Sequence, residues 1–196
     1  MSGETPWIGV LALQGAFAEH ESMLREMGAD CREIRNKQDL TENMAGLILP
    51  GGESSVQGKL LRDTGLYDPL RRRIESGMPV LATCAGLILL AREISNDDRR
   101  GFSTLPVRVK RNAYGRQLGS FTAFDDFAGE GPVAMRFIRA PYIESVLDDR
   151  VHILSRHEGK ITGVRYRNQL ALAFHPELGN DSRIHRRFLE MVRCAG

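Results

Sequence analysis

Short apolar runs alternate with stretches of helical spacing through the first half of the chain. The runs predict strands at residues 7–13, 30–34, 46–49 and 79–83, and the first of them suits a strand buried on both faces. Apolar side chains at helical spacing predict helices at residues 17–27, 67–76 and 85–94, and another helix that begins at Ser54. This alternation predicts an α/β fold with a parallel sheet.

The second half has a different pattern, in which short β-like segments are separated by Gly, Asn, Asp and Pro. These segments cover residues 107–110, 120–124, 134–137, 151–154, 161–165 and 170–174, and a helix is expected over residues 182–194. We therefore expect additional, partly antiparallel strands. No repeat or linker divides the sequence, so residues 1–196 are expected to form one domain, a flavodoxin-like three-layer sandwich with a mostly parallel central sheet.

Composition and charge narrow the classes of function. The chain has 196 residues, 42% of them hydrophobic, which is enough for a core without disulfides. Its 27 basic and 25 acidic side chains leave a net charge of +2, which argues against nucleic acid as a partner. The longest stretch without charge, residues 76–91, is too short to span a bilayer. Cys31, Cys84 and Cys194 are widely spaced and form no CxxC pair, so the sequence indicates neither a disulfide framework nor a metal site. We therefore expect a cytoplasmic protein.

Cys84 stands where a predicted strand turns abruptly into a predicted helix. The unpaired N–H groups and the dipole at a helix N-terminus favour a thiolate, so a cysteine in this place can be a nucleophile. The small residues Ala82 and Gly86 let strand and helix approach, as in the strained elbow that presents a hydrolase nucleophile, although glycine is more usual at position 82. The alternative is a small apolar residue at the end of a buried strand.

A nucleophilic cysteine needs a base, and His175 is the best placed of the five histidines. It follows a buried-strand pattern and precedes Pro176, which favours extended backbone. Alternation then puts His175 and Glu177 on the same side of the chain, as a base and its orienting carboxylate require. The alternative is a surface turn with Glu177 in solvent. His20, between two glutamates on a helix, is expected to be solvated rather than to be a second base.

A pair of glycines, Gly51 and Gly52, separates the third predicted strand from the following helix. Such a turn can direct backbone N–H groups at an anion, including the oxyanion of acyl transfer. It lacks the GxxxxGK[ST] pattern of a nucleotide P-loop, and no GxGxxG follows the first strand. The alternative is a tight turn in which Ser54 or Ser55 caps the helix.

Together, the cysteine, the His-x-Glu pair and the glycine turn resemble the site of class I, triad-type glutamine amidotransferases. Within that class the chain is similar to the glutaminase subunits of pyridoxal 5′-phosphate synthases. The matching segments, in the expected order along nearly the whole chain, are GVLALQGAFAEH (residues 9–20), LPGGESS (49–55), TCAGLILLA (83–91), RNAYGRQ (111–117), FIRAPYI (137–143) and FHPEL (174–178). Two positions depart from the family pattern, Ser55 in place of threonine and Ala82 in place of glycine, and neither removes a triad member.

The resemblance implies a role for each matched residue in the hydrolysis of glutamine. Cys84 would attack the side-chain amide carbon, His175 would act as general base and then as acid for the departing ammonia, and Glu177 would orient the histidine. Backbone N–H groups of Gly52 and Ala85 would form the oxyanion hole. No cofactor or metal is implied. The positions that match the family's glutamine-binding residues are Gly51, Gly52, Glu53, Arg111, Ile138 and Arg139.

The resemblance also implies a partner. In this family the glutaminase docks on a (β/α)8-barrel synthase subunit, which uses the ammonia to build pyridoxal 5′-phosphate, and several glutaminases surround a ring of synthase subunits in a large hetero-oligomer. The family's glutaminase is poorly active alone, because docking completes the oxyanion hole. The segment that begins at Gln14 and Gly15 matches the part of the family's chain near that interface.

Two other interpretations remain open from the sequence. A stand-alone cysteine-dependent γ-glutamyl hydrolase or peptidase on the same fold would use Cys84 and His175 but would not require the RNAYGRQ and FIRAPYI segments. In a non-enzymatic binding or regulatory protein, Cys84 would be unreactive towards alkylating agents at neutral pH. Replacing it by serine would then leave every activity intact.

Overall fold

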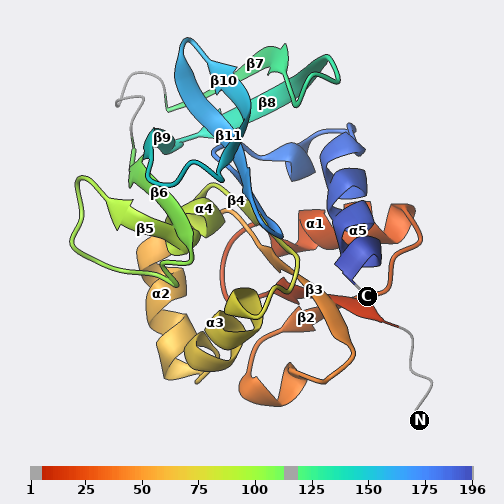
Figure 1. Ribbon diagram of the computed structural model, residues 1–196. Coiled ribbons are helices and arrows are strands. Elements are labelled where there is room, and N and C mark those ends of the chain that lie inside the picture. The colour runs from red at the N-terminus through yellow and green to blue at the C-terminus, as the bar shows by residue number, and fades with distance from the viewer. Residues whose placement is uncertain (1–5, 113–118, 196) are drawn as a thin grey trace.

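A mixed sheet forms the centre of the computed structural model, which describes residues 6–112 and 119–195 (Figure 1). Within the described residues most strands join this sheet, in the order β2 (Cys31–Ile34), β1 (Trp7–Leu11), β3 (Met44–Leu49), β4 (Val80–Thr83), β12 (Gln169–Leu172), β11 (Lys160–Tyr166), β9 (Tyr142–Val146), β6 (Leu105–Lys110) and β5 (Ala91–Ile94). A further strand, β10 (His152–His157), pairs with β11. A separate antiparallel pair consists of β7 (Ser120–Asp126) and β8 (Pro132–Ile138).

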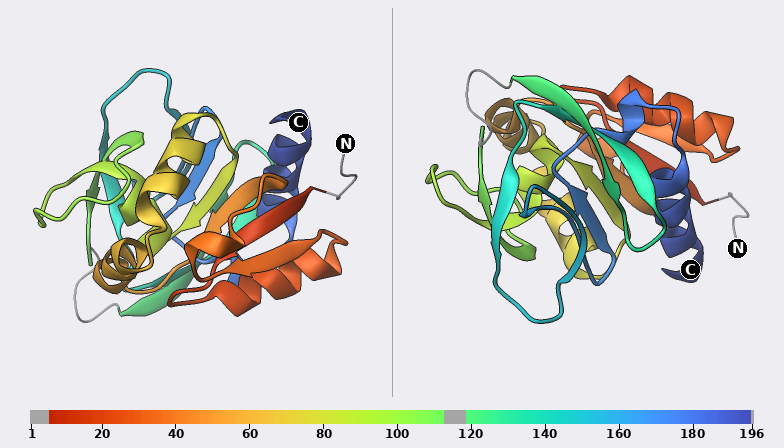
Figure 2. Two further views of the ribbon diagram at one scale, coloured as in Figure 1. Left: turned by 90° about the horizontal axis from the view of Figure 1, so that it is seen from below. Right: turned by 90° about the horizontal axis from the view of Figure 1, so that it is seen from above.

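Helices cover both faces of the sheet (Figures 1 and 2). The face that carries α1 (Phe17–Glu26) and α5 (Arg183–Ala195) is opposite the face that carries α2 (Ser54–Asp63), α3 (Tyr67–Glu75) and α4 (Ala85–Leu90). Side chains cap two of these helices, since the Glu53 carboxylate accepts from the Ser55 N–H and the Asp181 carboxylate accepts from the Arg183 N–H. No helix among the described residues is both long and apolar enough to cross a membrane.

The parallel part of the sheet comes from the first half of the chain. There β1 pairs in parallel with β2 and β3, β3 pairs with β4, and β4 pairs with β12. Every residue of β1 and β4 is buried, as expected for strands covered by helices on both sides. The later strands add antiparallel pairs of β11 with β12, β10 and β9, and of β9 with β6. The predicted flavodoxin-like α/β fold with extra antiparallel strands is therefore confirmed.

One predicted helix is wrong in its second half. The helix expected over residues 85–94 ends at Leu90, and Ala91–Ile94 forms β5 instead. The segment pairs in parallel with β6, and the carbonyl of Leu89 accepts a hydrogen bond from the N–H of Phe102 at 2.6 Å. Pairing with a neighbouring strand thus replaces the local helical preference of an apolar run.

The strand β9 is not among the predicted elements. Its residues Glu144 and Ser145 interrupt any apolar run, yet the strand fills the space between β6 and β11. It pairs on both edges, so its position is determined by its neighbours in the sheet rather than by its own sequence.

Candidate active site

Cys84 occupies the turn between the carboxyl end of β4 and the start of α4. Its backbone has φ 47° and ψ −97°, a strained conformation for a residue with a side chain, and its N–H donates to the carbonyl of Leu172 at 2.8 Å. Gly86 makes the turn possible, because a Cβ there would lie 2.2 Å from the carbonyl oxygen of Leu49. The expected strand-to-helix elbow is present, and it places the thiol at the helix N-terminus.

His175 and Glu177 lie beside this elbow, just beyond the end of β12. The N–H of His175 donates to the carbonyl of Arg136 on β8 at 2.8 Å, which fixes the backbone of the histidine. Its Nδ1 is 2.7 Å from Oε1 of Glu177, and both side chains are buried. The expected pairing of the two residues is present, but the expected alternation is wrong. Residues Pro176–Leu178 form a 3-10 helix, whose turn brings the carboxylate back to the imidazole.

The protonation of this pair follows from its contacts. Burial alone would lower the pKa of His175, but the hydrogen bonds that the imidazolium donates to Cys84 and Glu177, together with the negative charge of these two groups, raise it to about 10. Burial would raise the pKa of Glu177, but His20 and His175 outweigh it and hold the pKa of this carboxyl below its ordinary value. The imidazole is thus arranged to hold a proton beside the thiol, and Glu177 to stay ionised.

We expect His175 to remain protonated through neutral pH and to lose its proton near pH 10. Because its pKa is raised on folding, its contribution to stability is complete below about 6.5, the ordinary value, and is lost as the pH rises through about 10. Imidazole NMR between pH 5 and 11 measures this, and His185, with a pKa lowered to about 3 by burial, provides a neutral reference in the same spectra. A midpoint for His175 near 6.5 would contradict the assignment.

His20 is not solvated, so that expectation from the sequence is wrong. Its side chain is fully buried, with Nδ1 2.9 Å from Nε2 of His185 and Nε2 3.2 Å from Oγ1 of Thr83. The same Nε2 lies 3.5 Å from Oε2 of Glu177. The helical spacing of the sequence carried the relevant signal, because positions 17, 20 and 24 share one face of α1. The two flanking glutamates hid it.

The glycine turn lines the same pocket as Cys84. A Cβ on Gly51 would lie 2.1 Å from Cε1 of His175, so only glycine permits this approach of backbone and imidazole. The carbonyl of Gly51 accepts from the N–H of Ala16 at 3.0 Å, and the N–H of Glu53 donates to Oε1 of Gln14 at 2.7 Å. Two backbone segments far apart in sequence, residues 14–16 and 51–53, are thereby fixed against each other.

Replacing Gly51 by alanine should displace His175 and lower kcat by about 100-fold, the loss typical of misplacing a catalytic group by about 1 Å. The assay is glutamate release from glutamine. The matched control is Gly58→Ala on α2, where a Cβ would have its nearest neighbour at an ordinary 3.6 Å and alanine favours the helix. Equal activity of the two variants would show that the Gly51 contact does not position His175.

A pocket of about 310 Å³ opens between the glycine turn, the elbow and the end of β8. Most of the residues predicted to catalyse or to bind glutamine line it: Gly51, Gly52, Glu53, Cys84, Arg111, Ile138, Arg139 and His175. Glu177 lies behind His175, and Ala85 is buried in the first turn of α4. Residues 113–117 of the RNAYGRQ motif lie outside the described residues.

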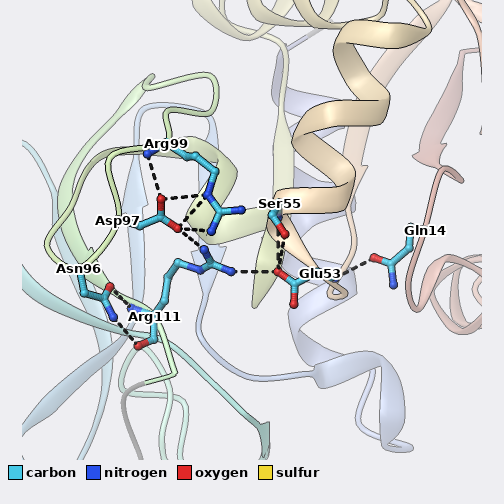
Figure 3. A network of polar contacts seen from close by, with 7 residues as sticks. All are labelled: Gln14, Glu53, Ser55, Asn96, Asp97, Arg99 and Arg111. Atoms are coloured by element: carbon cyan, nitrogen blue, oxygen red, sulfur yellow. Dashed lines mark hydrogen bonds and ion pairs between the residues drawn. The ribbon is translucent and has the colours of Figure 1, made fainter.

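Arg111 lines this pocket, and a network of polar contacts holds its guanidinium (Figure 3). Its Nη2 donates to Oε1 of Glu53 at 2.9 Å, and the same oxygen accepts from Oγ of Ser55 at 3.0 Å. Its Nη1 pairs with Asp97, which Arg99 also binds. Arg99 and then Arg111 hold the pKa of Asp97 far below its usual range. Asp97 carries no sequence motif and was not predicted, yet it supports the guanidinium from the loop after β5.

A cysteine at an elbow, beside a His–Glu pair at the carboxyl edge of a parallel sheet, is typical of triad-type hydrolases. The model of the SNO glutamine amidotransferase family matches residues 10–194. The chain belongs to this family.

Known relatives agree with this membership. The chain is 60% identical to the pyridoxal 5′-phosphate synthase subunit PdxT of Desulfitobacterium hafniense, over 94% of this chain and 92% of that one. It is 54% identical to the PdxT subunit of Methanocorpusculum labreanum, over 94% and 97% of the two chains. A crystal structure of a glutamine amidotransferase superposes with a TM-score of 0.89 at 42% identity, covering 95% and 98%.

A more distant structure shows how widely the fold occurs. A glutamine amidotransferase from Thermotoga maritima superposes with a TM-score of 0.61 at 18% identity, over 95% of this chain and 83% of that one. The family assignment confirms the expected enzyme, a glutamine amidotransferase. It does not favour a stand-alone γ-glutamyl hydrolase or peptidase.

Proposed function

We propose that this chain is the glutaminase subunit of a pyridoxal 5′-phosphate synthase. It hydrolyses L-glutamine to L-glutamate and ammonia, and the ammonia serves the synthesis of vitamin B6. The observation that carries the proposal is the 2.7 Å contact of His175 with Glu177, next to Cys84 in a pocket lined by the residues matched to glutamine binding. The chain's similarity to pyridoxal 5′-phosphate synthase subunits supports the proposal that the ammonia is used to make pyridoxal 5′-phosphate.

The reaction needs two acyl transfers at Cys84. His175 already holds the proton when the sulfur attacks the amide carbon of glutamine, and the imidazolium then protonates the departing nitrogen. The C–N bond breaks, ammonia leaves and a γ-glutamyl thioester remains. Water then attacks the thioester with His175 as base, which releases glutamate and restores the thiol. Glu177 keeps the imidazole in one tautomer and stabilises its charged form.

The remaining assigned residues bind the substrate and the developing charge. Backbone N–H groups of Gly52 and Ala85 form the oxyanion hole, where losing one donor costs about 3 kcal/mol of transition-state stabilisation. Among the glutamine-binding residues, Arg111 suits the α-carboxylate and Glu53 the ammonium, and their mutual ion pair at 2.9 Å keeps both side chains in place. The backbones of Gly51, Ile138 and Arg139 complete the pocket.

The chain works with a synthase subunit, and we propose that this partner is a (β/α)8 barrel in a large cytoplasmic hetero-oligomer. In that assembly residues 1–196 act as one glutamine amidotransferase domain. A partner that docks near Gln14 and Gly15 can change the conformation of the oxyanion hole directly, because the adjacent N–H of Ala16 donates to the carbonyl of Gly51 at 3.0 Å. The same peptide unit carries the N–H of Gly52, so moving one segment reorients the other.

The test is glutamate release by the purified chain with and without its synthase subunit, together with pyridoxal 5′-phosphate formation from glutamine or from an ammonium salt. We expect hydrolysis to rise when the synthase subunit is added. With glutamine as the nitrogen source, product formation should require both subunits, whereas ammonium should bypass the glutaminase. If hydrolysis is equally fast with and without the synthase subunit, and no pyridoxal 5′-phosphate forms from glutamine, the chain is instead a stand-alone amidohydrolase.

A further inference from the structure

Behind the proposed triad, a second pair of histidines is buried against Glu177. Oε1 of this carboxylate is hydrogen-bonded to His175. In the described part of the chain, Oε2 is buried and makes no hydrogen bond of ordinary geometry. The polar atom facing Oε2 is Nε2 of His20, at 3.5 Å, and both side chains are fully buried. An ionised oxygen without solvent requires a donor, and His20 is in place to supply one.

The contacts of His185 determine which nitrogen of His20 carries the proton. Nε2 of His185 lies 2.9 Å from Nδ1 of His20, and Nδ1 of His185 has no partner in the described part of the chain. A proton on that Nδ1 would be a buried donor without an acceptor, so the proton belongs on Nε2 of His185, which donates to His20. His20 must then carry its own proton on Nε2, directed at Glu177 and at Oγ1 of Thr83.

Both histidines are neutral in this arrangement. Burial lowers the pKa of His20, and the repulsion of His175 adds to this, while the opposing attraction of Glu177 and Glu19 is smaller than the effect of burial. Burial likewise lowers the pKa of His185 to about 3. A neutral imidazole donates one hydrogen bond in a defined direction, which suits the orientation of a carboxylate.

We propose that His20 is a positioning residue of the glutaminase site, whose Nε2–H holds the outer oxygen of Glu177, with His185 fixing the tautomer. The inference rests on the proposed role of the Cys84, His175 and Glu177 set. Held at both oxygens, the carboxylate cannot rotate away from His175, and the imidazole stays aligned with the sulfur. His185 on α5 thus donates to His20 on α1, and His20 donates to Glu177 in the turn after β12. These two hydrogen bonds extend the triad into the core.

The test compares three variants in the complex with the synthase subunit. His20→Leu removes the donor, and His20→Gln keeps an amide N–H near the place of Nε2. Leu24→Ala removes buried side-chain volume from the same helix, one turn after His20, and leaves the His20 donor in place. We expect His20→Leu to lower kcat about tenfold with little change in KM, as losing one hydrogen bond to a charged group predicts. His20→Gln should recover most of this loss, and Leu24→Ala should lower only the melting temperature.

A second readout separates positioning from stability. The rate of Cys84 alkylation by iodoacetamide is measured against pH on the free chain. As the pH is lowered, the rate should begin to fall at a higher pH in His20→Leu than in the wild type, and at the wild-type pH in Leu24→Ala. If His20→Leu does not fold, His20→Asn, whose amide is too short to reach Glu177, takes its place. Identical kcat and pH profiles for the His20 and Leu24 variants would overturn the inference. Retained hydrolysis in Cys84→Ala would instead overturn the proposed function itself.

Discussion

Replacing Cys84 by alanine should abolish glutamine hydrolysis, with kcat falling by about 10⁶-fold, as when the nucleophile of a hydrolase triad is removed. No thioester can form without the sulfur, and no other cysteine of the chain lines the pocket in the described residues. The assay is glutamate release in the presence of the synthase subunit.

The matched control is Cys194→Ala, which changes an exposed cysteine on α5. This variant should keep full activity, and synthase binding should be the same in both. Glutamate release by Cys84→Ala within tenfold of wild type would mean that another group carries the reaction.

Replacing Glu177 by glutamine should lower kcat by about 10⁴-fold, the loss that follows when a triad carboxylate becomes an amide. The side chain keeps its size, but it no longer stabilises an imidazolium, so the pKa of His175 should fall from about 10. Steady-state kinetics and the imidazole NMR titration measure the two effects on the same protein.

The control for this variant is Glu144→Gln, at an exposed position on β9. It should change neither kcat nor the titration of His175. A Glu177→Gln enzyme with kcat within tenfold of wild type would show that the carboxylate does not orient the base.

Burial and parallel pairing explain why so much of the site could be predicted from the sequence. The carboxyl ends of β3, β4 and β12 meet at one edge of the sheet, so residues that follow the three strands, Gly51, Cys84 and His175, had to come together. Each also carried a local signal, a glycine pair, a strand-to-helix turn or a proline after a buried strand.

Other features depend on contacts that local sequence does not encode. Asp97 reaches Arg111 from a neighbouring loop, and β5 forms from a helix-like run because β6 lies beside it. His20 is the instructive error, since its two glutamate neighbours suggested solvent while its helical position pointed into the core. A polar side chain on the apolar face of a helix is better interpreted as buried and partnered.

The central claim is that glutamine is attacked by Cys84, and covalent labelling tests it most directly. A chloroketone with the side chain and α-groups of glutamine is added to the complex, and the product is examined by intact mass and peptide mapping. We expect one adduct per chain, located on Cys84, formed more slowly when glutamine is present and not formed in Cys84→Ala. Labelling of Cys31 or Cys194 instead, or labelling that glutamine does not slow, would contradict it.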